Sequence, residues 1–236
     1  MAESKEFLRI SNLQSWYGES HILHGVDMTV NEGEVVTLLG RNGAGRTTTV
    51  KSILGLVGRR TGSITIKGQE TVNWAPHQIA KLGIGYCPEE RGIFSALTCE
   101  ENLLLPPVIA PNGMSVEEIY EMFPNLLERR NSPGTRLSGG EQQMLAVGRI
   151  LRTGARFLLL DEISEGLAPV IVQALARMIT ALKAKGFTII MVEQNFRFAA
   201  PLADRFYVME HGQMVESFTS QELSSKMGML NEYLGV

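Results

Sequence analysis

A glycine-rich loop near residue 40 has the spacing most clearly linked to chemistry. Residues 40–47 read Gly-Arg-Asn-Gly-Ala-Gly-Arg-Thr, which fits a phosphate-binding loop except that Arg46 stands where lysine is usual. Glycines let the backbone wrap an anion closely, and successive N–H groups together with the following helix N-terminus hold its charge. We therefore expect a nucleotide phosphate site, with these binding residues: Gly40, Arg41, Asn42, Gly43, Ala44, Gly45, Arg46, Thr47 and Thr48.

Three side chains of this loop have distinct expected roles. Thr47 offers a hydroxyl to Mg²⁺, and Thr48 is placed to contact the α-phosphate. Arg46 keeps the positive charge of the usual lysine on a bulkier, planar head, so nucleotide binding should survive the exchange. The alternative is a glycine-rich turn between a strand and a helix that binds no ligand.

Two adjacent carboxylates follow the apolar run at residues 157–160. Such a strand is typical of the middle of a parallel sheet, whose carboxyl end binds ligands in α/β proteins. Asp161 would hold Mg²⁺, and Glu162 would orient and deprotonate an attacking water. A strand ending in two solvated acids is the alternative.

The elements that must position these groups alternate between strand and helix. Hydrophobic patterning predicts a helix after Gly40 as far as Leu56, and capping boxes predict helices after Ser115 and from Ser138 to about Gly154. A further helix is expected from 169 to 186. Strands are expected at residues 7–10, 34–39, 63–67, 157–160, 188–192, 206–209 and 213–215. This order predicts an α/β fold with a parallel core.

Composition narrows the class of protein. The 236 residues have a formal net charge of −3 and are 44% hydrophobic, which excludes wholesale disorder and gives no basic field for nucleic acid. Cys87 and Cys99 show no metal-type spacing, so reduced thiols are expected. No apolar run approaches the roughly 18–20 residues that span a bilayer, so a membrane role would have to come through a partner.

The segment at residues 137–143, Leu-Ser-Gly-Gly-Glu-Gln-Gln, resembles the LSGGQ signature of ATP-binding-cassette (ABC) ATPases. Two glycines in a first helical turn are costly, and they make sense if bare backbone approaches a second ligand. The resemblance covers nearly the whole chain. It implies that Ser138, Gly139, Gly140 and Glu141 contact the ATP of a partner subunit, that Tyr17 stacks on adenine, that Glu89 takes the metal-contacting Q-loop position, and that Gln194 occupies the switch position.

Three segments together resemble one branch of that family, the LivF-type subunits of branched-chain amino acid importers. These are residues 88–94, 162–169 and 192–195. The branch commonly has Glu and Gln where Glu89 and Gln194 stand, whereas Arg46 departs from its pattern. An importer ATPase of the urea or amide type is a close relative and stays open as an alternative.

The resemblance implies a P-loop NTPase fold: a RecA-like parallel sheet core, an N-terminal antiparallel β subdomain and a helical subdomain at approximately residues 89–153, all within a single domain at 7–236. It further implies ATP and Mg²⁺ as cofactors, Glu162, Arg46 and Gln194 as catalytic residues, and Thr47, Glu89 and Asp161 as metal ligands. Nucleotide would be sandwiched between two ATPase subunits, as a heterodimer or a homodimer. Two permease subunits and, indirectly, a periplasmic solute-binding protein complete the importer, with this chain peripheral on the cytoplasmic face of the membrane.

A rival interpretation is a nucleotide-binding regulatory subunit in which Arg46 and Gln194 leave hydrolysis negligible. The presence of Glu162 argues against it. No residue supports a third class, an ABC ATPase that serves cofactor assembly or cell division.

Overall fold

The computed structural model describes residues 5–234 and has two sheets. The larger sheet has the strand order β10-β9-β3-β8-β7-β6. All neighbouring strands in it are parallel except the pair β10 and β9. Its strands are β3 (Val35–Leu39), β6 (Ile84–Cys87), β7 (Phe157–Asp161), β8 (Thr188–Val192), β9 (Arg205–Glu210) and β10 (Gln213–Thr219).

The central strands are apolar throughout because both faces of this sheet are covered. Along β7, Phe157 and Leu159 pack in the core shared with the smaller sheet. Leu158 and Leu160 pack in the core beneath the helices on the other face. This alternation follows from the two-residue repeat of a strand.

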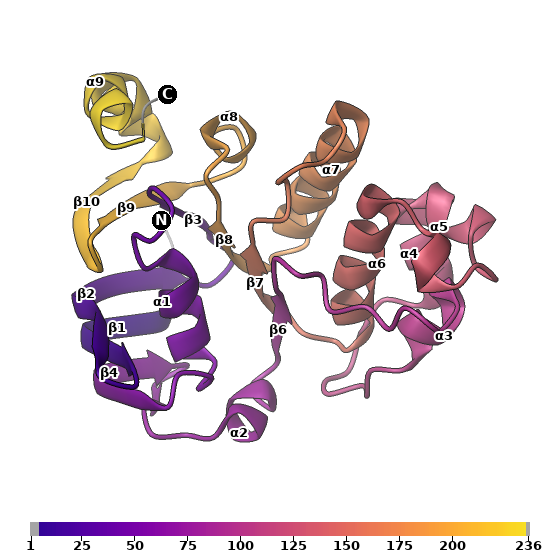
Figure 1. Cartoon of the computed structure of the whole chain (residues 1–236), viewed down its shortest axis with the longest axis horizontal. Coiled ribbons are helices and arrows are strands. Elements are labelled where there is room, and N and C mark those ends of the chain that lie inside the picture. The colour runs from indigo at the N-terminus through magenta and orange to yellow at the C-terminus, as the bar shows by residue number, and fades with distance from the viewer. Residues whose placement is uncertain (1–4, 235–236) are drawn as a thin grey trace.

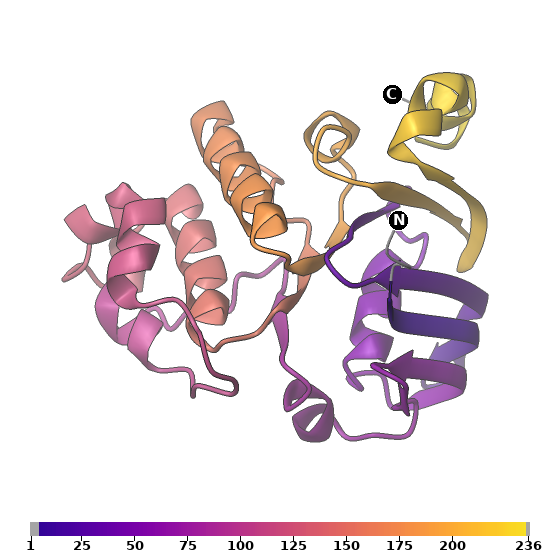
Figure 2. The same cartoon turned by 180° about the vertical axis from the view of Figure 1, so that it is seen from behind.

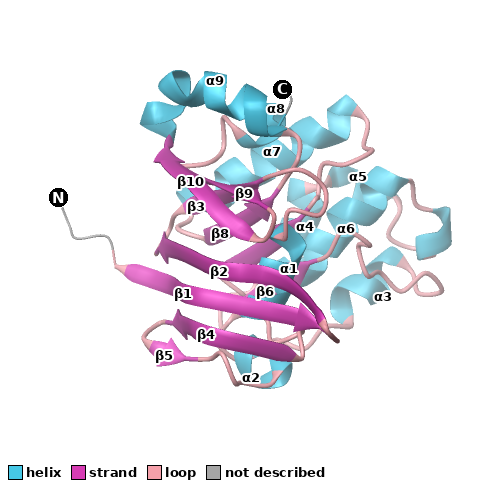
Figure 3. Cartoon of the chain, turned by 60° about the vertical axis from the view of Figure 1, so that its left-hand side comes forward, coloured by secondary structure: helices cyan, strands magenta, loops and turns pink. Residues whose placement is uncertain are grey.

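The smaller sheet is antiparallel, with the order β2-β1-β4-β5, and forms an outer layer of the molecule (Figure 3). Its strands are β1 (Glu6–Tyr17), β2 (Ser20–Asn31), β4 (Arg59–Ile66) and β5 (Gln69–Glu70). Helix α1 (Arg46–Ile53) packs in the core between the two sheets through Val50 and Ile53. The phosphate loop, residues 40–48, therefore lies between the two layers.

Helices cover the other face of the larger sheet, and the group α3–α6 lies at the far end of the molecule from the antiparallel sheet (Figures 1 and 2). These helices are α3 (Cys99–Leu104), α4 (Val116–Met122), α5 (Pro124–Glu128), α6 (Gly139–Arg152) and α7 (Pro169–Ala184). The remaining ones are α2 (Pro76–Ala80), α8 (Phe196–Ala199), α9 (Leu223–Leu234) and the short 3₁₀ turns Gly134–Arg136 and Ser220–Glu222. Between residues 5 and 234, no helix has both the length and the apolarity needed to cross a bilayer.

The predicted α/β fold with a parallel core is confirmed, and the capping boxes at Ser115 and Ser138 form as expected. Three strands were missed: β2, the two-residue β5 and β6. In β2 the buried positions step from Leu23 to Val26, because the pairing with β1 shifts there, and the shift breaks the alternation that identifies a strand. Strand β6 has only four residues and contains a glycine. The helix predicted as far as Leu56 ends at Ile53.

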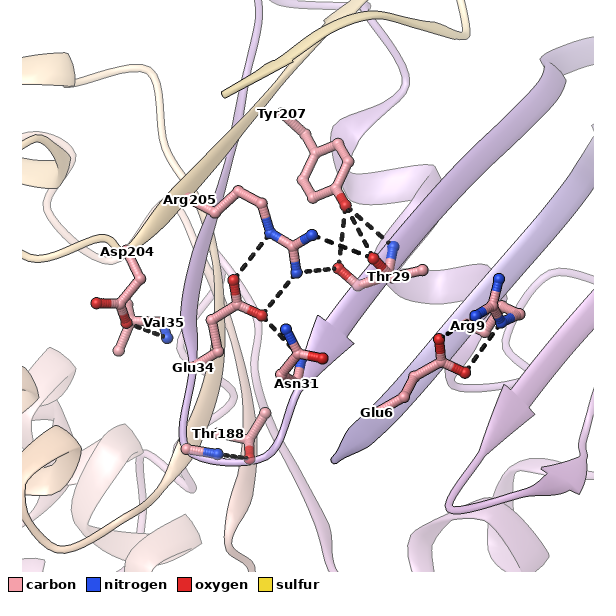
Figure 4. Close-up of polar contacts among 11 residues, drawn as sticks. Glu6, Arg9, Thr29, Asn31, Glu34, Val35, Thr188, Asp204, Arg205 and Tyr207 are labelled. Atoms are coloured by element: carbon pink, nitrogen blue, oxygen red, sulfur yellow. Dashed lines mark hydrogen bonds and ion pairs between the residues drawn. The ribbon is translucent and has the colours of Figure 1, made fainter. Parts of the chain in front are cut away.

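A polar cluster joins the two sheets at the amino-terminal ends of β3 and β9, the opposite end of β3 from the phosphate loop (Figure 4). The Arg205 guanidinium donates to both carboxylate oxygens of Glu34 at 2.8 and 2.7 Å and to the carbonyl of Thr29 at 2.9 Å. The Tyr207 hydroxyl lies 3.1 Å from both the backbone N and the carbonyl O of Thr29. Thr29 is on β2 and Arg205 is on β9, so the cluster fixes one sheet against the other.

Replacing Arg205 by alanine should lower the free energy of unfolding by about 2–4 kcal/mol, because it leaves the largely buried Glu34 carboxylate without its partner. Arg9→Ala is the matched control: its ion pair with Glu6 is exposed, so its loss should cost less than about 1 kcal/mol. Urea denaturation measures both. Equal losses in the two variants would contradict a fastening role for Arg205.

Candidate functional site

The phosphate loop connects β3 to α1, and its last glycine determines where the helix begins. Gly45 caps α1 in the left-handed region, at φ +104°, where a Cβ would lie 2.9 Å from Leu23 Cδ2. Only glycine fits this position without strain. The N–H groups of the first turn of α1 have no partner within the helix, so they are available to an anion at its N-terminus.

A cavity of about 500 Å³ opens at this helix terminus, and we call it the phosphate cavity. Tyr17 belongs to its lining and is 46% exposed. The predicted residues Asn42–Thr48, Glu89 and Glu162 also line it. Gly40 is not in the lining, and the Arg41 guanidinium instead donates to the carbonyls of Tyr233 and Glu232 at the end of α9, at 2.9 and 3.0 Å.

A hydroxyl and a carboxylate meet at the base of the loop, as predicted for a metal site. Thr47 Oγ1 donates to Asp161 Oδ1 at 3.1 Å, and the Tyr86 hydroxyl donates to Asp161 Oδ2 at 3.3 Å. Burial raises the pKa of Asp161, and these two hydrogen bonds oppose the shift. Hydroxyl and carboxylate oxygens fit Mg²⁺, which takes few protein ligands and completes its shell with water and phosphate. No cluster of three acidic, histidine or cysteine side chains that could hold a metal ion occurs in the described part of the chain.

Arg46 and Glu162 form a buried ion pair that the sequence did not predict. Arg46 Nη2 lies 2.7 Å from Glu162 Oε1, and the two side chains are only 6% and 8% exposed. Burial raises the pKa of Glu162, and the Arg46 charge opposes that shift. Arg46 Nη1 is buried and has no hydrogen-bond partner among residues 5–234. A buried donor without a partner is costly, so an anion entering the cavity would satisfy it.

Glu162 is also held from the neighbouring strand. Its backbone is left-handed, at φ +51°, and its Oε2 accepts a hydrogen bond from the backbone N–H of Gln194 at 3.2 Å. Gln194 itself lines a second cavity of about 660 Å³, which we call the switch cavity. The two cavities share Glu162 and Glu165 in their linings. Gln194 therefore lies beside the carboxylate rather than in the phosphate cavity.

The signature residues lie apart from both cavities in this chain. Ser138 caps α6 by accepting a hydrogen bond from the N–H of Glu141 at 3.3 Å. Gly140 packs against Ile171 so closely that a Cβ would lie 2.6 Å from Ile171 Cγ1. Packing within the chain thus already explains one of the two glycines, whereas the sequence argument assigned both to a second ligand. None of residues 138–141 lines either cavity.

Sequence reasoning missed two polar residues beside the site, Tyr86 and Glu193. Glu193 is fully buried and accepts hydrogen bonds from the backbone N–H and hydroxyl of Ser164, at 3.2 and 2.8 Å. A signal was available: Glu193 follows the apolar residues 188–192 just as the acidic pair follows residues 157–160.

The buried Glu193 predicts a pH-dependent stability. Burial raises the pKa of Glu193 to about 8, with the Glu162 carboxylate adding to the shift and Arg46 opposing it. An unfolded chain loses this proton near a pKa of about 4.3, so the contribution of Glu193 to stability is fullest below that pH and falls as the pH rises towards 8. Glu193→Gln has no proton to lose. The free energy of unfolding of the variant minus that of the parent should therefore rise between pH 5.5 and 7.5, by at most about 1.4 kcal/mol per pH unit. Urea denaturation at three pH values measures it, and a constant difference would contradict the prediction.

Comparisons with known proteins identify relatives that bind ATP. A family profile described as "ABC transporter" matches residues 23–165. The chain is 39% identical over 97% of its length, and 99% of the relative's, to the high-affinity branched-chain amino acid transport ATP-binding protein BraG of Pseudomonas aeruginosa. It is 33% identical, over 97% of both chains, to the lipopolysaccharide export system ATP-binding protein LptB of Haemophilus influenzae.

A solved structure of a nucleotide-free ATP-binding cassette from an ABC transporter shares the fold. The TM-score is 0.83 at 24% identity, with 97% of each chain covered. The family profile matches more than half of the chain, including the phosphate loop, the signature and the acidic pair. The chain therefore belongs to the ABC transporter family, as an ATP-binding cassette subunit.

Proposed function

We propose that this chain hydrolyses Mg-ATP to drive solute transport through membrane permease subunits. The observation that carries the proposal is the buried Arg46–Glu162 pair between the phosphate loop and the switch cavity. It puts a cation that can neutralise phosphate beside a carboxylate that can accept a proton. A binding module without hydrolysis has no need of that carboxylate.

The residues around the phosphate cavity have separate proposed roles in binding Mg-ATP. The amides of the phosphate loop and the N-terminus of α1 hold the phosphates, and the half-exposed Tyr17 offers its ring to adenine at the rim of the cavity. Mg²⁺ would be held by Thr47 and Asp161, with Glu89 in reach of the same cavity, and would neutralise charge on the phosphates.

Hydrolysis in this scheme begins with an exchange of partners. The γ-phosphate takes over Arg46, which frees the Glu162 carboxylate. Glu162 then accepts a proton from the water that attacks the γ-phosphorus, and ADP leaves as the bridging bond breaks. The backbone N–H of Gln194 holds Glu162. The Gln194 side chain cannot carry a proton at neutral pH, so its part is limited to a hydrogen-bond contact with the γ-phosphate.

A second ATPase subunit completes the site. Residues 138–141 lie outside the phosphate cavity of their own chain, which supports their contacting the nucleotide of a partner, in a heterodimer or a homodimer. The subunit would then be peripheral, on the cytoplasmic face of the membrane.

The 39% identity to BraG supports import of branched-chain or other hydrophobic amino acids, with a periplasmic solute-binding protein as an indirect partner. Uptake of labelled leucine by cells that lack and then regain this gene tests the solute. Loss and recovery of leucine uptake supports the proposal. Loss of urea uptake alone favours the urea-type importer, and a defect in lipopolysaccharide export alone favours a role like that of LptB.

The permease contact is assigned to the helical subdomain, approximately residues 89–153. A groove of about 370 Å³ is lined in part by this segment, including the loop residues Arg91 and Gly92 and Ile150 of α6, together with the preceding Pro88. Phe94, Leu104 and Val108 are exposed apolar side chains of the same segment. An apolar helix from a permease would cover both the groove and these side chains.

Phe94→Glu should abolish capture of the permease from detergent-solubilised membranes, since it puts a charge into this apolar surface. Leu127→Glu is the matched control. Leu127 is as exposed as Phe94, and neither side chain lines the groove, but Leu127 lies on α5, outside the segment 88–109 that carries the loop residues of the groove and the three exposed side chains. Undiminished capture by Phe94→Glu, with ATP binding intact, would move the contact elsewhere.

A further inference from the structure

Two carboxyl groups at the ends of neighbouring strands are bonded in a reciprocal pattern. Strands β7 and β8 are parallel and pair Asp161 with Val192, so Glu162 and Glu193 follow side by side. Glu162 accepts from the N–H of Gln194, one residue beyond Glu193. Glu193 in turn accepts from the N–H and hydroxyl of Ser164, two residues beyond Glu162. The loop after each strand thus holds the carboxyl group that follows the other strand.

Glu193 does no chemistry in the proposed mechanism, yet its burial is complete. Its side chain has no exposed surface, and Ser164 is only 4% exposed. A carboxyl group in such a place costs free energy unless its hydrogen bonds repay it. An apolar residue would fill the position at lower cost, so packing alone does not account for the Glu193–Ser164 contact.

The loop after β7 must hold Glu162 in an unfavourable backbone conformation. Glu162 sits in a left-handed backbone conformation, which a non-glycine residue adopts only when its surroundings impose it. When a phosphate takes Arg46 away, the Glu162 carboxylate keeps its hydrogen bond from the Gln194 N–H. The Ser164–Glu193 bonds keep the two loops at the spacing that this bond needs.

We propose that Glu193 is a positioning residue for the base Glu162, acting through Ser164 and the reciprocal bonds between the loops after β7 and β8. The proposal rests on the hydrolytic function argued above. Glu193 touches no substrate. It raises the fraction of time in which the Glu162 carboxylate is oriented to accept a proton from the attacking water, once Arg46 has turned to the phosphate.

Kinetics on the full chain provide the first test. Glu193→Ala should lower kcat about tenfold or more while KM for Mg-ATP and the affinity for a fluorescent ATP analogue stay within about twofold, since misplacing a catalytic group costs rate rather than binding. Glu193→Gln keeps an amide oxygen that can accept from Ser164 and should retain at least about half of kcat. Ser164→Ala should fall between them, and it should add little to Glu193→Ala in the double variant. Glu128→Ala, an exposed change on α5, is the control.

Hydrogen exchange of the nucleotide-free chain provides a second test that needs no hydrolysis. Glu193→Ala should speed exchange in peptides that contain the amides of Ser164 and of Gln194, whereas Glu193→Gln should not. If the parent does not hydrolyse ATP, the proposed function fails, and the exchange result still decides the positioning claim. Unchanged exchange at Gln194 would overturn it, as would an unaltered kcat in Glu193→Ala or parallel losses of kcat, nucleotide affinity and melting temperature.

Discussion

Glu162→Gln should bind Mg-ATP and lower its turnover by about 10²–10⁴-fold, the usual contribution of a general base. Glutamine keeps an oxygen for the Gln194 N–H but cannot take a proton from water. It also cannot form the ion pair with Arg46, so phosphate no longer competes with a carboxylate for that side chain. Affinity for ATP should therefore be equal to or higher than that of the parent, and ATP-bound dimers should accumulate.

Phosphate release and size-exclusion chromatography with Mg-ATP measure these two effects. Glu128→Gln, an exposed change of the same kind, should leave both unaltered. A Glu162→Gln variant that retains more than half of the parent turnover would remove this carboxylate from the role of base.

Arg46→Ala should lower turnover by about 10²-fold or more, comparable to the loss of one preorganised donor that stabilises charge in a transition state. The loop amides and the N-terminus of α1 do not depend on this side chain, so part of the ATP affinity should persist. Arg46→Lys should keep or raise the activity, because a lysine ammonium is the usual occupant of this position.

One side effect of Arg46→Ala must be separated from catalysis. The substitution leaves Glu162 buried without its partner, which is destabilising. The double variant Arg46→Ala/Glu162→Gln removes that unpaired charge, so it should recover the melting temperature but not the turnover. Parent-like hydrolysis by Arg46→Ala would show that Arg46 does not replace the loop lysine.

Local patterns predicted those parts of the fold that depend on neighbouring residues. The apolar runs at 157–160 and 188–192 form central strands, and Ser138 caps a helix, as predicted. Both features depend only on residues that are close together in the sequence. Strand β2 was missed because its register is set by a bulge opposite β1, which depends on two strands at once. The larger sheet and the antiparallel layer agree with the fold implied by the family resemblance.

In the candidate site too, the features set by neighbouring residues were predicted, and the contacts between separate elements were not. The spacing of residues 40–48 and of the acidic pair predicted which residues would meet, and most of them line one cavity. Two contacts depended on side-chain orientation across separate elements, and no local pattern encodes that. Arg46 turned to Glu162 rather than standing free for phosphate, and Glu193 reached Ser164 in the loop after the adjacent strand.

The central claim is that this cassette, with arginine in place of the loop lysine, hydrolyses Mg-ATP in a site shared between two subunits. The most direct measurement is the rate of phosphate release per chain against protein concentration, with and without Mg²⁺, alone and with the partner ATPase added. We predict a Mg²⁺-dependent rate that rises with concentration or on addition of the partner and is lost in Glu162→Gln. Release at the buffer rate under every condition, together with saturable ATP binding, would contradict the claim and identify a regulatory subunit.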